Sequence, residues 1–462
     1  MIVAFASLFL GLVLGVQPVE VAVGQGVASV ELVLDGQTVG RVSGEPWTLP
    51  CDFGGDLAPH RLDAIGRDKG GREIGRAVQW INLPRPQAEG HAVFEGGHDG
   101  RGVIARLTWE SVSGDEPRRV TASFDGRPLA VSDPRHIELP PHDPDRLHFL
   151  HAELEFPSHL SAVVEVPFGG TYAQQTATEL TATAVALQGG RELPPPSDLA
   201  GWFEAGGARL PVVAAEKGPA EVVVVMDREA QEVLWALALR WYPSRAGASA
   251  PSETGSQEKG LDAGWRRFGG GSVASEMLRY AMQLGDEQSL RFLWPFSLHR
   301  ESDRTSYDLF ARSEEHPPRD GGVFWLLASA HQPPFPVAEQ RLADAVAVAG
   351  MTAAARDRRR AVVLFLGEQP RDVSQFAAPA VRRYLSSLEV PLHVWSVAKQ
   401  VSPVVEARWG EVRSVYSRRH FERAVRDLSQ SLDAQRIVWL EGLHLPQEIR
   451  VGAAARGLEI VR

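Results

Sequence analysis

Two acidic residues, Asp227 and Glu229, follow an apolar run and are the first candidates for chemistry in this chain. Residues 221–226 read Glu-Val-Val-Val-Val-Met, which predicts a central parallel strand that is buried on both faces. Open α/β sheets bind ligands at the carboxyl ends of their strands, where Asp227 stands. The two carboxylates could carry out acid–base chemistry, as in a hydrolase, but no third polar partner accompanies them in the sequence.

A second candidate is Ser272, which follows three glycines at 269–271. Glycine runs before a serine occur in oxyanion loops, so Ser272 could be the nucleophile of a hydrolase. No glycine follows the serine and the run adjoins a low-complexity segment, so a flexible hinge is the favoured interpretation. The motifs of phosphate loops, nucleophile elbows and zinc proteases do not occur in the chain.

The densest histidine cluster lies between residues 136 and 151. His148 and His151 are three apart on a predicted strand and therefore point to opposite faces, which argues against a shared metal ion. A solvated loop and strand is the favoured interpretation. The cluster consists of His136, His142, His148 and His151, with Asp143 and Asp145.

The composition is typical of soluble globular proteins, with 23% charged and 44% hydrophobic residues. At 462 residues, two to four domains are expected. The net charge of −10 disfavours nucleic acid and anionic membrane surfaces as partners. Cys51 is the only cysteine, which excludes a disulfide within the chain and any cysteine-based zinc cluster.

Residues 2–16 are uncharged and apolar. The run is shorter than the roughly 20 residues of a spanning helix and is typical of the hydrophobic region of a secretory signal. We therefore predict a signal peptide at 1–16, no integral membrane span beyond it, and a secreted, periplasmic or cell-envelope location. The alternative interpretation is a buried first strand of the module that follows.

Short alternating strands separated by turn residues come next and predict two all-β sandwiches. Asp35-Gly36 and Asp125-Gly126 are strong signals for two-residue hairpins. The first module resembles bacterial immunoglobulin-like modules, in which a strand, an Asp-Gly turn and a second strand precede a proline–aromatic bend, here Pro46-Trp47. The predicted boundaries are 17–86 for the first sandwich, 90–190 for the second and 191–218 for a linker.

Strands and helices alternate from residue 219 to residue 462, which predicts a doubly wound, Rossmann-type α/β domain. A low-complexity stretch at 243–271 is expected to be a disordered surface insertion. The arginines at 356–360 suit a helix C-terminus, where the helix dipole favours cations. The predicted helices cover 230–240, 337–355, 375–388 and 418–432, and the strands after 221–226 cover 289–294, 361–366, 392–397 and 436–440.

This order of strands and helices resembles a von Willebrand factor type A domain. The whole chain, with its apolar start, immunoglobulin-like module, second β module and terminal β segments, is similar to the VWFA-related proteins of the acidobacterial type. The resemblance implies two immunoglobulin-like sandwiches followed by an A-type domain, and a protein-binding or adhesion function.

The signature of that family is a metal-ion-dependent adhesion site, in which two hydroxyls and one or two carboxylates bind a divalent ion. The resemblance places Asp227 in the first loop of this site, where Glu229 and Gln231 stand at the two hydroxyl positions. Arg228 adds a positive charge beside the remaining acid.

The other loops of the site also depart from the family pattern. Val323 stands where the second turn has its threonine, and Leu366 stands where the third turn has its aspartate. We therefore expect a degenerate site without a metal or a cofactor. Asp227 would then cap the next helix or pair with Arg228.

The leading hypothesis is a non-enzymatic, exported protein of the adhesion type that binds an unknown protein partner through this degenerate face. A structural envelope scaffold is the alternative, and a hydrolase that uses Asp227 and Glu229, or Ser272, is a third possibility. Exposed apolar residues on the face favour binding, a featureless polar face favours a scaffold, and a deep pocket favours a hydrolase. The face consists of Asp227, Arg228, Glu229, Gln231, Val323 and Leu366.

Overall fold

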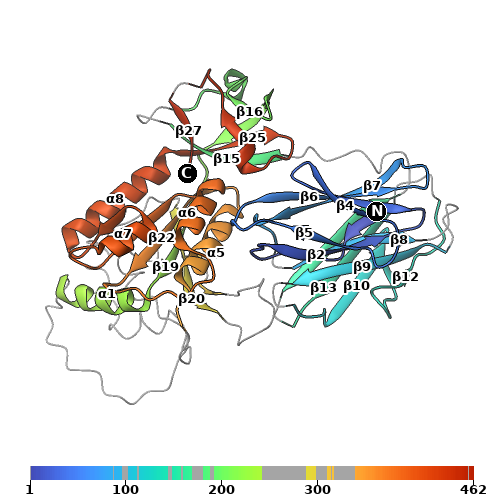
Figure 1. The fold of residues 1–462 in the computed structure, drawn as a ribbon, viewed down its shortest axis with the longest axis horizontal. Coiled ribbons are helices and arrows are strands. Elements are labelled where there is room, and N and C mark those ends of the chain that lie inside the picture. Colours follow the sequence, from blue (N-terminus) through green and yellow to red (C-terminus); the bar gives the residue numbers. More distant parts are fainter. Residues whose placement is uncertain are drawn as a thin grey trace, which may run out of the picture. The chain divides into compact units, whose positions relative to one another are not determined.

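The chain folds into two compact units (Figure 1). The described residues up to 168 form the first unit, and those from 180 onward form the second. Within the described ranges, no helix combines the length and the apolar character needed to cross a membrane. The computed structural model describes residues 2–86, 88–95, 102–111, 114–143, 148–157, 160–168, 180–187, 192–241, 288–297, 310–313, 315–316, 339–455 and 457–462.

The first unit begins with a β-sandwich whose two sheets share one apolar core, which includes Val19, Val30 and Leu62. One sheet has the order β1 (Val3–Phe5), β2 (Val16–Val23), β5 (Thr48–Asp52). The other has the order β4 (Gln37–Val42), β3 (Ser29–Leu34), β6 (His60–Arg67), β7 (Glu73–Ile81).

A second sandwich follows in the same unit, with a core of its own. Along its strand β13, Leu150, Ala152 and Leu154 are buried while Phe149 is exposed, which is the alternation of a half-buried strand. One sheet has the order β12 (Ile137–Glu138), β9 (Ile104–Ser111), β8 (Ala88–Glu95). The other has the order β11 (Arg127–Leu129), β10 (Arg119–Phe124), β13 (His148–Glu155), β14 (Ser161–Phe168).

Both Asp-Gly hairpins form where the sequence predicts them. Asp35 and Gly36, between β3 and β4, have φ angles of 49° and 80°. Asp125 and Gly126, between β10 and β11, have φ angles of 48° and 75°. Two successive positive φ angles are those of a type I′ turn, which matches the twist of the flanking strands.

The apolar start of the chain is part of the first sandwich. β1 pairs with β2, with Phe5 opposite Val21. The main chain of Val13 donates to Oδ1 of the buried Asn82 at 2.7 Å and accepts from its Nδ2 at 2.9 Å. The core therefore includes residues before 17, so the boundary predicted there is wrong. The structure agrees with the alternative interpretation, a buried first strand.

The second unit contains a six-stranded sheet, and its strand β19 is buried at all seven residues. Neighbouring strands run parallel except β21, which is antiparallel to β20. The order is β21 (Phe310–Arg312), β20 (Gln288–Ser297), β19 (Ala220–Met226), β22 (Arg359–Leu366), β23 (Leu392–Ser396), β24 (Val412–Ser414).

Helices cover both faces of this sheet (Figure 1). Val222 and Val224 of β19 share a core with α1 (Arg228–Trp241) and α8 (Arg418–Ala434). Helix α5 (Leu342–Ala354) packs against β19, β20 and β22 from the other face, because successive side chains of a strand point to opposite sides. Helix α6 (Ala378–Ser387) packs on α5, and α7 (Pro403–Trp409) packs on α6.

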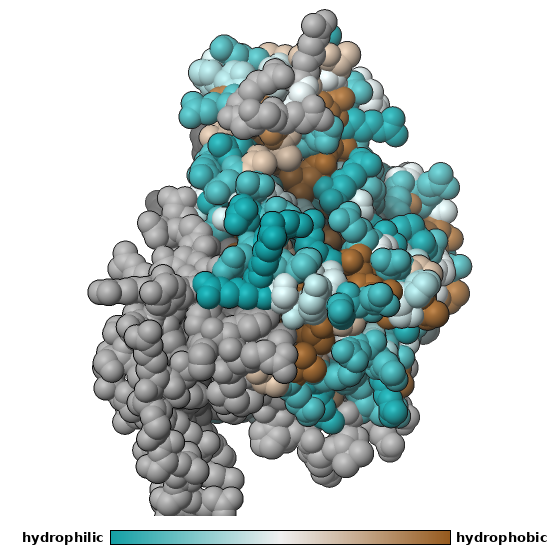
Figure 2. All heavy atoms as spheres, turned by 90° about the vertical axis from the view of Figure 1, so that its left-hand side faces the viewer, coloured by the Kyte–Doolittle hydropathy of each residue, from teal (hydrophilic) through white to brown (hydrophobic). Residues whose placement is uncertain are grey.

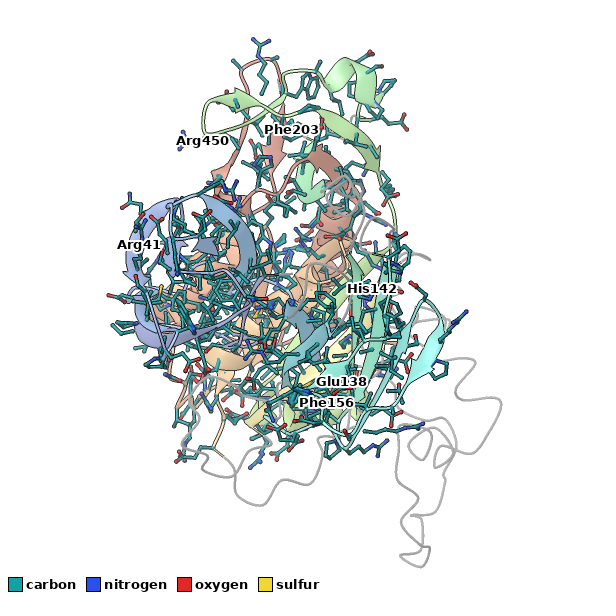
Figure 3. All side chains as sticks on the ribbon, turned by 90° about the vertical axis from the view of Figure 1, so that its right-hand side faces the viewer. Arg41, Glu138, His142, Phe156, Phe203 and Arg450 are labelled. Atoms are coloured by element: carbon teal, nitrogen blue, oxygen red, sulfur yellow. The ribbon has the colours of Figure 1, made fainter. Side chains whose placement is uncertain are left out.

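Two short antiparallel sheets complete the second unit, and they combine segments from both sides of the α/β portion. Phe203 lies buried in their shared core while Arg450 is exposed; both are labelled in Figure 3. One sheet has the order β18 (Val212–Glu216), β25 (Gln435–Glu441), β15 (Leu180–Leu187), β27 (Leu458–Ile460). The other has the order β17 (Ala208–Arg209), β16 (Phe203–Ala205), β26 (Ile449–Val451).

These sheets correct three predictions. Residues 180–187 were assigned to the second sandwich, but β15 pairs with β25 and β27. The segment 191–218 is not a linker, since it forms β16, β17, β18 and the 3-10 helix η2 (Pro196–Leu199). Residues 436–440 form a strand, but outside the six-stranded sheet. Residues 180–187 and 436–440 form strands, as their sequence patterns predict, but the strands with which they pair differ from the prediction.

The amino end of β22 joins the six-stranded sheet to the two short antiparallel sheets, here the terminal β structure. The main-chain N–H of Arg360 donates to Gln435 Oε1 at 2.9 Å, and Gln435 Nε2 donates back to the Arg360 carbonyl at 3.0 Å. The Arg360 guanidinium lies 3.4 Å from Glu389, whose Oε2 accepts from the Ala184 N–H at 2.6 Å.

The prediction that the arginines at 356–360 sit at a helix C-terminus is correct only for Arg356, which directly follows Ala355, the C-cap residue of α5. Helix α5 ends at Ala354, and the buried Arg359 and Arg360 begin β22. Arg356 and Arg358 pair with Glu315 instead. Arg358, Arg359 and Arg360 therefore take their positions from tertiary partners. The insertion at 243–271, Ser272, Val323 and Asp145 lie outside the described residues.

Candidate functional site

Asp227 directly follows β19, at the carboxyl end of the strand as the sequence predicts, and it meets the loop after the neighbouring strand β22. The side chain of Asp227 is 1% exposed. Its Oδ2 accepts from the Gly367 N–H at 2.9 Å, and its Oδ1 accepts from Gln340 Nε2 at 2.8 Å. A third donor, the Glu229 N–H, reaches Oδ1 at 3.3 Å, which is the capping contact expected of an acid before a helix.

Burial raises the pKa of the Asp227 carboxyl above its ordinary value, against the lowering effect of the hydrogen bonds from Gly367 and Gln340. Each oxygen is nevertheless engaged by an N–H group. A divalent cation needs oxygen ligands, so it could bind here only after these donors had been displaced. Within the described residues, no group of three or more His, Cys, Asp or Glu side chains is arranged to hold a metal ion.

Glu229 closes the other side of the same loop. Its Oε2 accepts from the Gln369 N–H at 3.1 Å. Gly367 has no room for a side chain, since an added Cβ would lie 2.4 Å from Glu229 Oε2 and 2.7 Å from Glu229 Cβ. The two acids at 227 and 229 therefore bind the main chain of the loop after β22, and neither is arranged as a free catalytic carboxylate.

The remaining predicted site residues lie apart from this hydrogen-bond network or contribute only their main chain. The Arg228 guanidinium stacks over Phe296 at 4.8 Å, so it does not pair with Asp227. The main-chain N–H of Arg228 donates to Gln340 Oε1 at 2.8 Å. Gln231 contributes its N–H to the first helical hydrogen bond of α1. Leu366 is fully buried at the end of β22, so its assignment to the exposed face is wrong. Leu366 is the last residue of a central strand, and side chains on both faces of such a strand are buried.

A second network, which the sequence did not reveal, fixes the same loop against α5. Asp344 accepts from the Gln375 and Phe376 N–H groups at 3.0 and 2.9 Å. In return, Asp372 accepts from the Leu342 N–H at 2.9 Å and so caps α5 from thirty residues away. No local capping motif signals this, because the N-terminal neighbour of α5 is Arg341, whose side chain makes no cap.

Two exposed valines stand on this edge of the sheet. Val373 of the loop is 50% exposed and Val404 of α7 is 68% exposed. An ion pair connects the two segments, because Arg408, one turn after Val404, pairs at 3.0 Å with Asp372, which precedes Val373 in the chain. Figure 2 shows the side of the molecule on which α1, α7 and α8 lie in Figure 1; its described surface is mainly hydrophilic, with separate hydrophobic patches.

Two histidines of the cluster, His148 and His151, have separate partners on opposite faces of β13. His148 Nδ1 lies 2.7 Å from Asp125, and its Nε2 lies 2.8 Å from the Asp143 carbonyl. Burial lowers the pKa of His148, but these hydrogen bonds outweigh it and raise the pKa above the ordinary value. His151 points to the other face, toward Glu153 and Glu165, so the predicted alternation is confirmed.

No family model and no curated protein matches the chain. Aligned solved structures include the fibronectin(III)-like modules of Clostridium thermocellum CbhA, with 13% identity over 38% of this chain and 99% of that chain, at a TM-score of 0.16. The central fibronectin-III array of RIM-binding protein aligns with 9% identity over 44% and 83%, at a TM-score of 0.20. Proximal thread matrix protein 1 from the mussel byssus aligns with 10% identity over 52% and 50%, at a TM-score of 0.27. At such scores these likenesses assign neither family nor function, and the β-sandwich character of the first unit rests on its own sheets.

Proposed function

We propose that the second unit is a degenerate A-type domain that binds a protein partner through the carboxyl edge of its six-stranded sheet, without a metal ion. In this proposal the chain is a non-enzymatic, exported protein of the adhesion type. One observation carries it: N–H donors engage both oxygens of the Asp227 carboxylate, while Val373 and Val404 stand exposed on the same edge.

The surface formed by Val373, Val404 and Arg408, here the valine edge, has the features of a protein contact. Exposed apolar side chains beside the partly exposed Arg408, which the buried Asp372 holds in place, favour a partner that can cover them. The loop that carries Val373 is held by Asp344 and by α5, so little conformational entropy would be lost on binding.

The two other hypotheses have less support. A hydrolase that uses Asp227 and Glu229 would need their carboxylates to reach a substrate, whereas both bind main-chain N–H groups of the loop. A purely structural scaffold needs no exposed apolar residues on this edge, so the two valines favour binding.

Capture of partners by the immobilised full chain tests the proposal. The full chain is required, because a fragment beginning at residue 200 would lack β15, which pairs with β25. Wild type, the Val373→Asp/Val404→Asp variant and the control Val213→Asp are each incubated with secreted and envelope proteins in the presence of a chelator. Val213 is a matched control, since it is exposed on β18, away from the valine edge.

We expect a partner that wild type and the control retain and the double variant loses. A partner released by the chelator would contradict metal-independent binding, and one retained by the double variant would place the contact elsewhere. If no protein is retained by wild type, the scaffold hypothesis replaces the proposal.

A further inference from the structure

The two sandwiches of the first unit are built on one plan. Each has a four-stranded sheet with an Asp-Gly hairpin at one edge, in the order β4, β3, β6, β7 in the first sandwich and β11, β10, β13, β14 in the second. In each, the aspartate of the hairpin also holds the next strand of the sheet. Asp35 Oδ1 accepts from the main-chain N–H of Arg61 at 2.9 Å, and Asp125 Oδ1 accepts from that of Phe149 at 2.9 Å.

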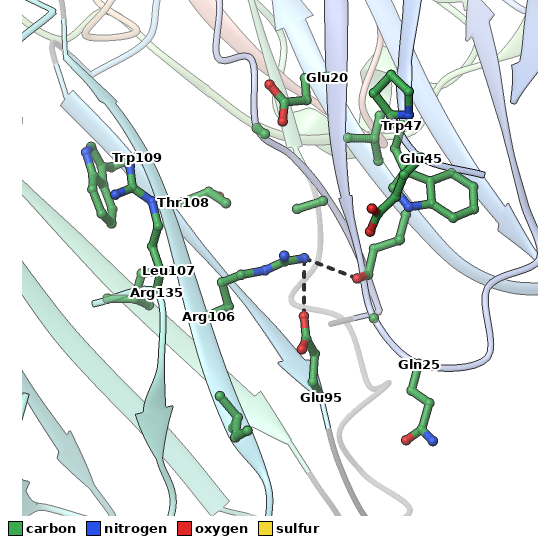
Figure 4. Close-up of a pocket in the computed structure, with 17 residues that line it drawn as sticks. Glu20, Gln25, Glu45, Trp47, Glu95, Arg106, Leu107, Thr108, Trp109 and Arg135 are labelled. Carbon is green, nitrogen blue, oxygen red and sulfur yellow. Dashed lines mark hydrogen bonds and ion pairs between the residues drawn. The ribbon is translucent and has the colours of Figure 1, made fainter. Parts of the chain in front are cut away.

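The two hairpins can be altered independently of the contact between the sandwiches. That contact surrounds an open hollow, whose lining belongs to the three-stranded sheets and the segments beside them (Figure 4). At its centre Arg106 Nη2 donates to the Val23 carbonyl at 3.1 Å and pairs with Glu95 at 3.3 Å. Both hairpins lie in the four-stranded sheets, so each can serve as a matched control for the other.

A histidine at the start of the held strand contacts the same aspartate in both sandwiches. His60 Nδ1 lies 2.7 Å from Asp35 Oδ2, and His148 Nδ1 lies 2.7 Å from Asp125 Oδ2. An ionised carboxylate can only accept a hydrogen bond, so Nδ1 carries a proton in both rings.

The two rings differ at their other nitrogen. His148 Nε2 lies 2.8 Å from the carbonyl oxygen of Asp143, which is a second acceptor. His60 Nε2 is buried and has no hydrogen-bond partner within the described residues. A neutral imidazole has one N–H and an imidazolium has two. The neutral ring is therefore sufficient for His60, whereas only the imidazolium satisfies both acceptors of His148.

Three titratable residues of the described chain surround the His148 ring. Asp125 and Asp143 supply its two acceptors, and the ring of His142 lies edge-on with its centroid at 5.0 Å. Burial lowers the pKa of His148, but the hydrogen bonds to Asp125 and Asp143 outweigh this and raise it above the ordinary value. In return, the hydrogen bond from His148 lowers the pKa of the Asp125 carboxyl. The surroundings thus favour the charged ring.

We infer that His148 is a pH-sensitive link, whose imidazolium holds the main chain at Asp143 to the Asp125 hairpin and whose neutral ring releases Asp143. When the ring loses one proton, the hydrogen bond to the carboxylate of Asp125 keeps the proton on Nδ1, because it is charge-assisted. The lone pair of Nε2 then faces the carbonyl oxygen of Asp143. Two acceptors at 2.8 Å repel each other, so this contact must open.

The direction of the pH response follows from the raised pKa. The folded chain holds the His148 proton more tightly than the unfolded chain does. The stabilisation is complete below the pKa of an unfolded histidine, about 6.5, and is lost as the pH rises through the raised value. The link to Asp143 is therefore closed in acid and open in alkali.

Nuclear magnetic resonance of the full chain with isotope-labelled histidine tests the inference, because the nitrogen shifts show which ring nitrogen carries a proton. Loss of a signal in His148→Gln identifies His148. Hydrogen exchange at Leu139, whose N–H donates to the Val103 carbonyl at 2.9 Å, reports on the segment that ends at Asp143. Protection is expressed relative to an unstructured chain at the same pH.

The test variant is Asp125→Asn and the matched control is Asp35→Asn. Both positions have positive φ angles, of 48° and 49°, which asparagine adopts as readily as aspartate. The amide oxygen can still accept the main-chain N–H, and the NH₂ group can donate to Nδ1 of a neutral ring. In Asp125→Asn the proton of neutral His148 can then move to Nε2 and hold Asp143 at every pH.

We expect wild-type His148 to titrate above pH 6.5. Protection at Leu139 should fall over this range, by up to about tenfold for each pH unit that separates the two pKa values. In Asp125→Asn the pKa of His148 should fall and the protection should no longer depend on pH, while Asp35→Asn should behave like wild type. The inference is overturned if wild-type His148 titrates at or below about 6.5, if wild-type protection is independent of pH, or if the two variants behave alike.

Discussion

A carboxylate is buried at each end of the strands of the six-stranded sheet, Asp227 at the carboxyl ends and Glu389 at the amino ends. The two sites compensate the desolvation of the carboxylate in different ways. At the carboxyl edge, three N–H donors surround the two oxygens of Asp227. At the amino edge, Glu389 accepts one N–H, from Ala184, and lies 3.4 Å from the Arg360 guanidinium. The other oxygen of Glu389, Oε1, has no hydrogen-bond partner in the described part of the chain.

We call the hydrogen-bond network around Asp227 the clamp and the Arg360–Glu389 pair the joint. The N–H donors around Asp227 belong to neighbouring loops of one sheet edge, so their hydrogen bonds hold that edge in one conformation. The Arg360–Glu389 pair joins the sheet to β15, which belongs to the terminal β structure. Burial raises the pKa of Glu389 to about 7, against the lowering effect of Arg360, so the joint is sensitive to pH near neutrality.

The largest effect is expected from Arg360→Ala, which leaves Glu389 buried without a cation. Removal of one partner of a buried ion pair costs about 4 kcal/mol. We expect this loss in the free energy of urea unfolding of the full chain, with hydrogen exchange at β25 locating it. The control Arg358→Ala removes a partly exposed pair with Glu315 and should cost less than about 1 kcal/mol. Equal losses would remove the distinction between the joint and a surface pair.

The next largest effect is expected in the pH dependence of stability. The pKa of Glu389 is raised from 4.5 to about 7 on folding, so the folded state holds this proton more tightly than the unfolded state. The contribution of Glu389 to stability is therefore most favourable below pH 4.5 and falls as the pH rises to 7, by up to about 3 kcal/mol. The difference in unfolding free energy between Glu389→Gln and wild type should change in favour of the variant over this range. A difference independent of pH would contradict the raised pKa.

At the clamp, Asp227→Asn should cost about 2 kcal/mol, because an amide NH₂ would face the Gly367 or Gln340 donors. Hydrogen exchange at Gly367 should accelerate in this variant. Glu368→Gln, an exposed change in the same loop, serves as the control and should leave exchange unaltered. Calorimetric titration of wild type with Mg²⁺, Mn²⁺ and Ca²⁺ should show no saturable heat; heat that disappears in Asp227→Asn would mean that metal displaces the N–H donors.

The smallest effect is expected at the valine edge, where Val373→Asp/Val404→Asp should change stability by less than about 0.5 kcal/mol. Both side chains are exposed, so little packing is lost. Thermal unfolding measures this change. A large loss of stability would show that the valines pack against the protein and are not free for a partner.

Local pattern located most strands and helices of the described chain. The apolar run at 221–226 is β19, the predicted helix 418–432 is α8, and the Asp-Gly pairs form the expected turns. The short helix α7 and strand β24 went unpredicted, since seven and three residues carry too little periodicity to be recognised. Asp227 could be chosen as a candidate site residue from the sequence because it stands at the carboxyl end of a predicted strand.

Within the strands and helices that it located, local sequence pattern indicated which side chains face a core, because burial follows from a period of two in strands and 3.6 in helices. Which elements become partners depends on contacts between distant parts of the chain. Strand β15 pairs with β25, more than 240 residues later, and Gln340 and Gly367 reach Asp227 across more than 110 residues. The alternation of apolar and polar residues along a strand indicates which face each side chain takes. The main-chain hydrogen bonds, however, are the same for every partner strand. The choice between partners therefore depends on the packing of the whole unit.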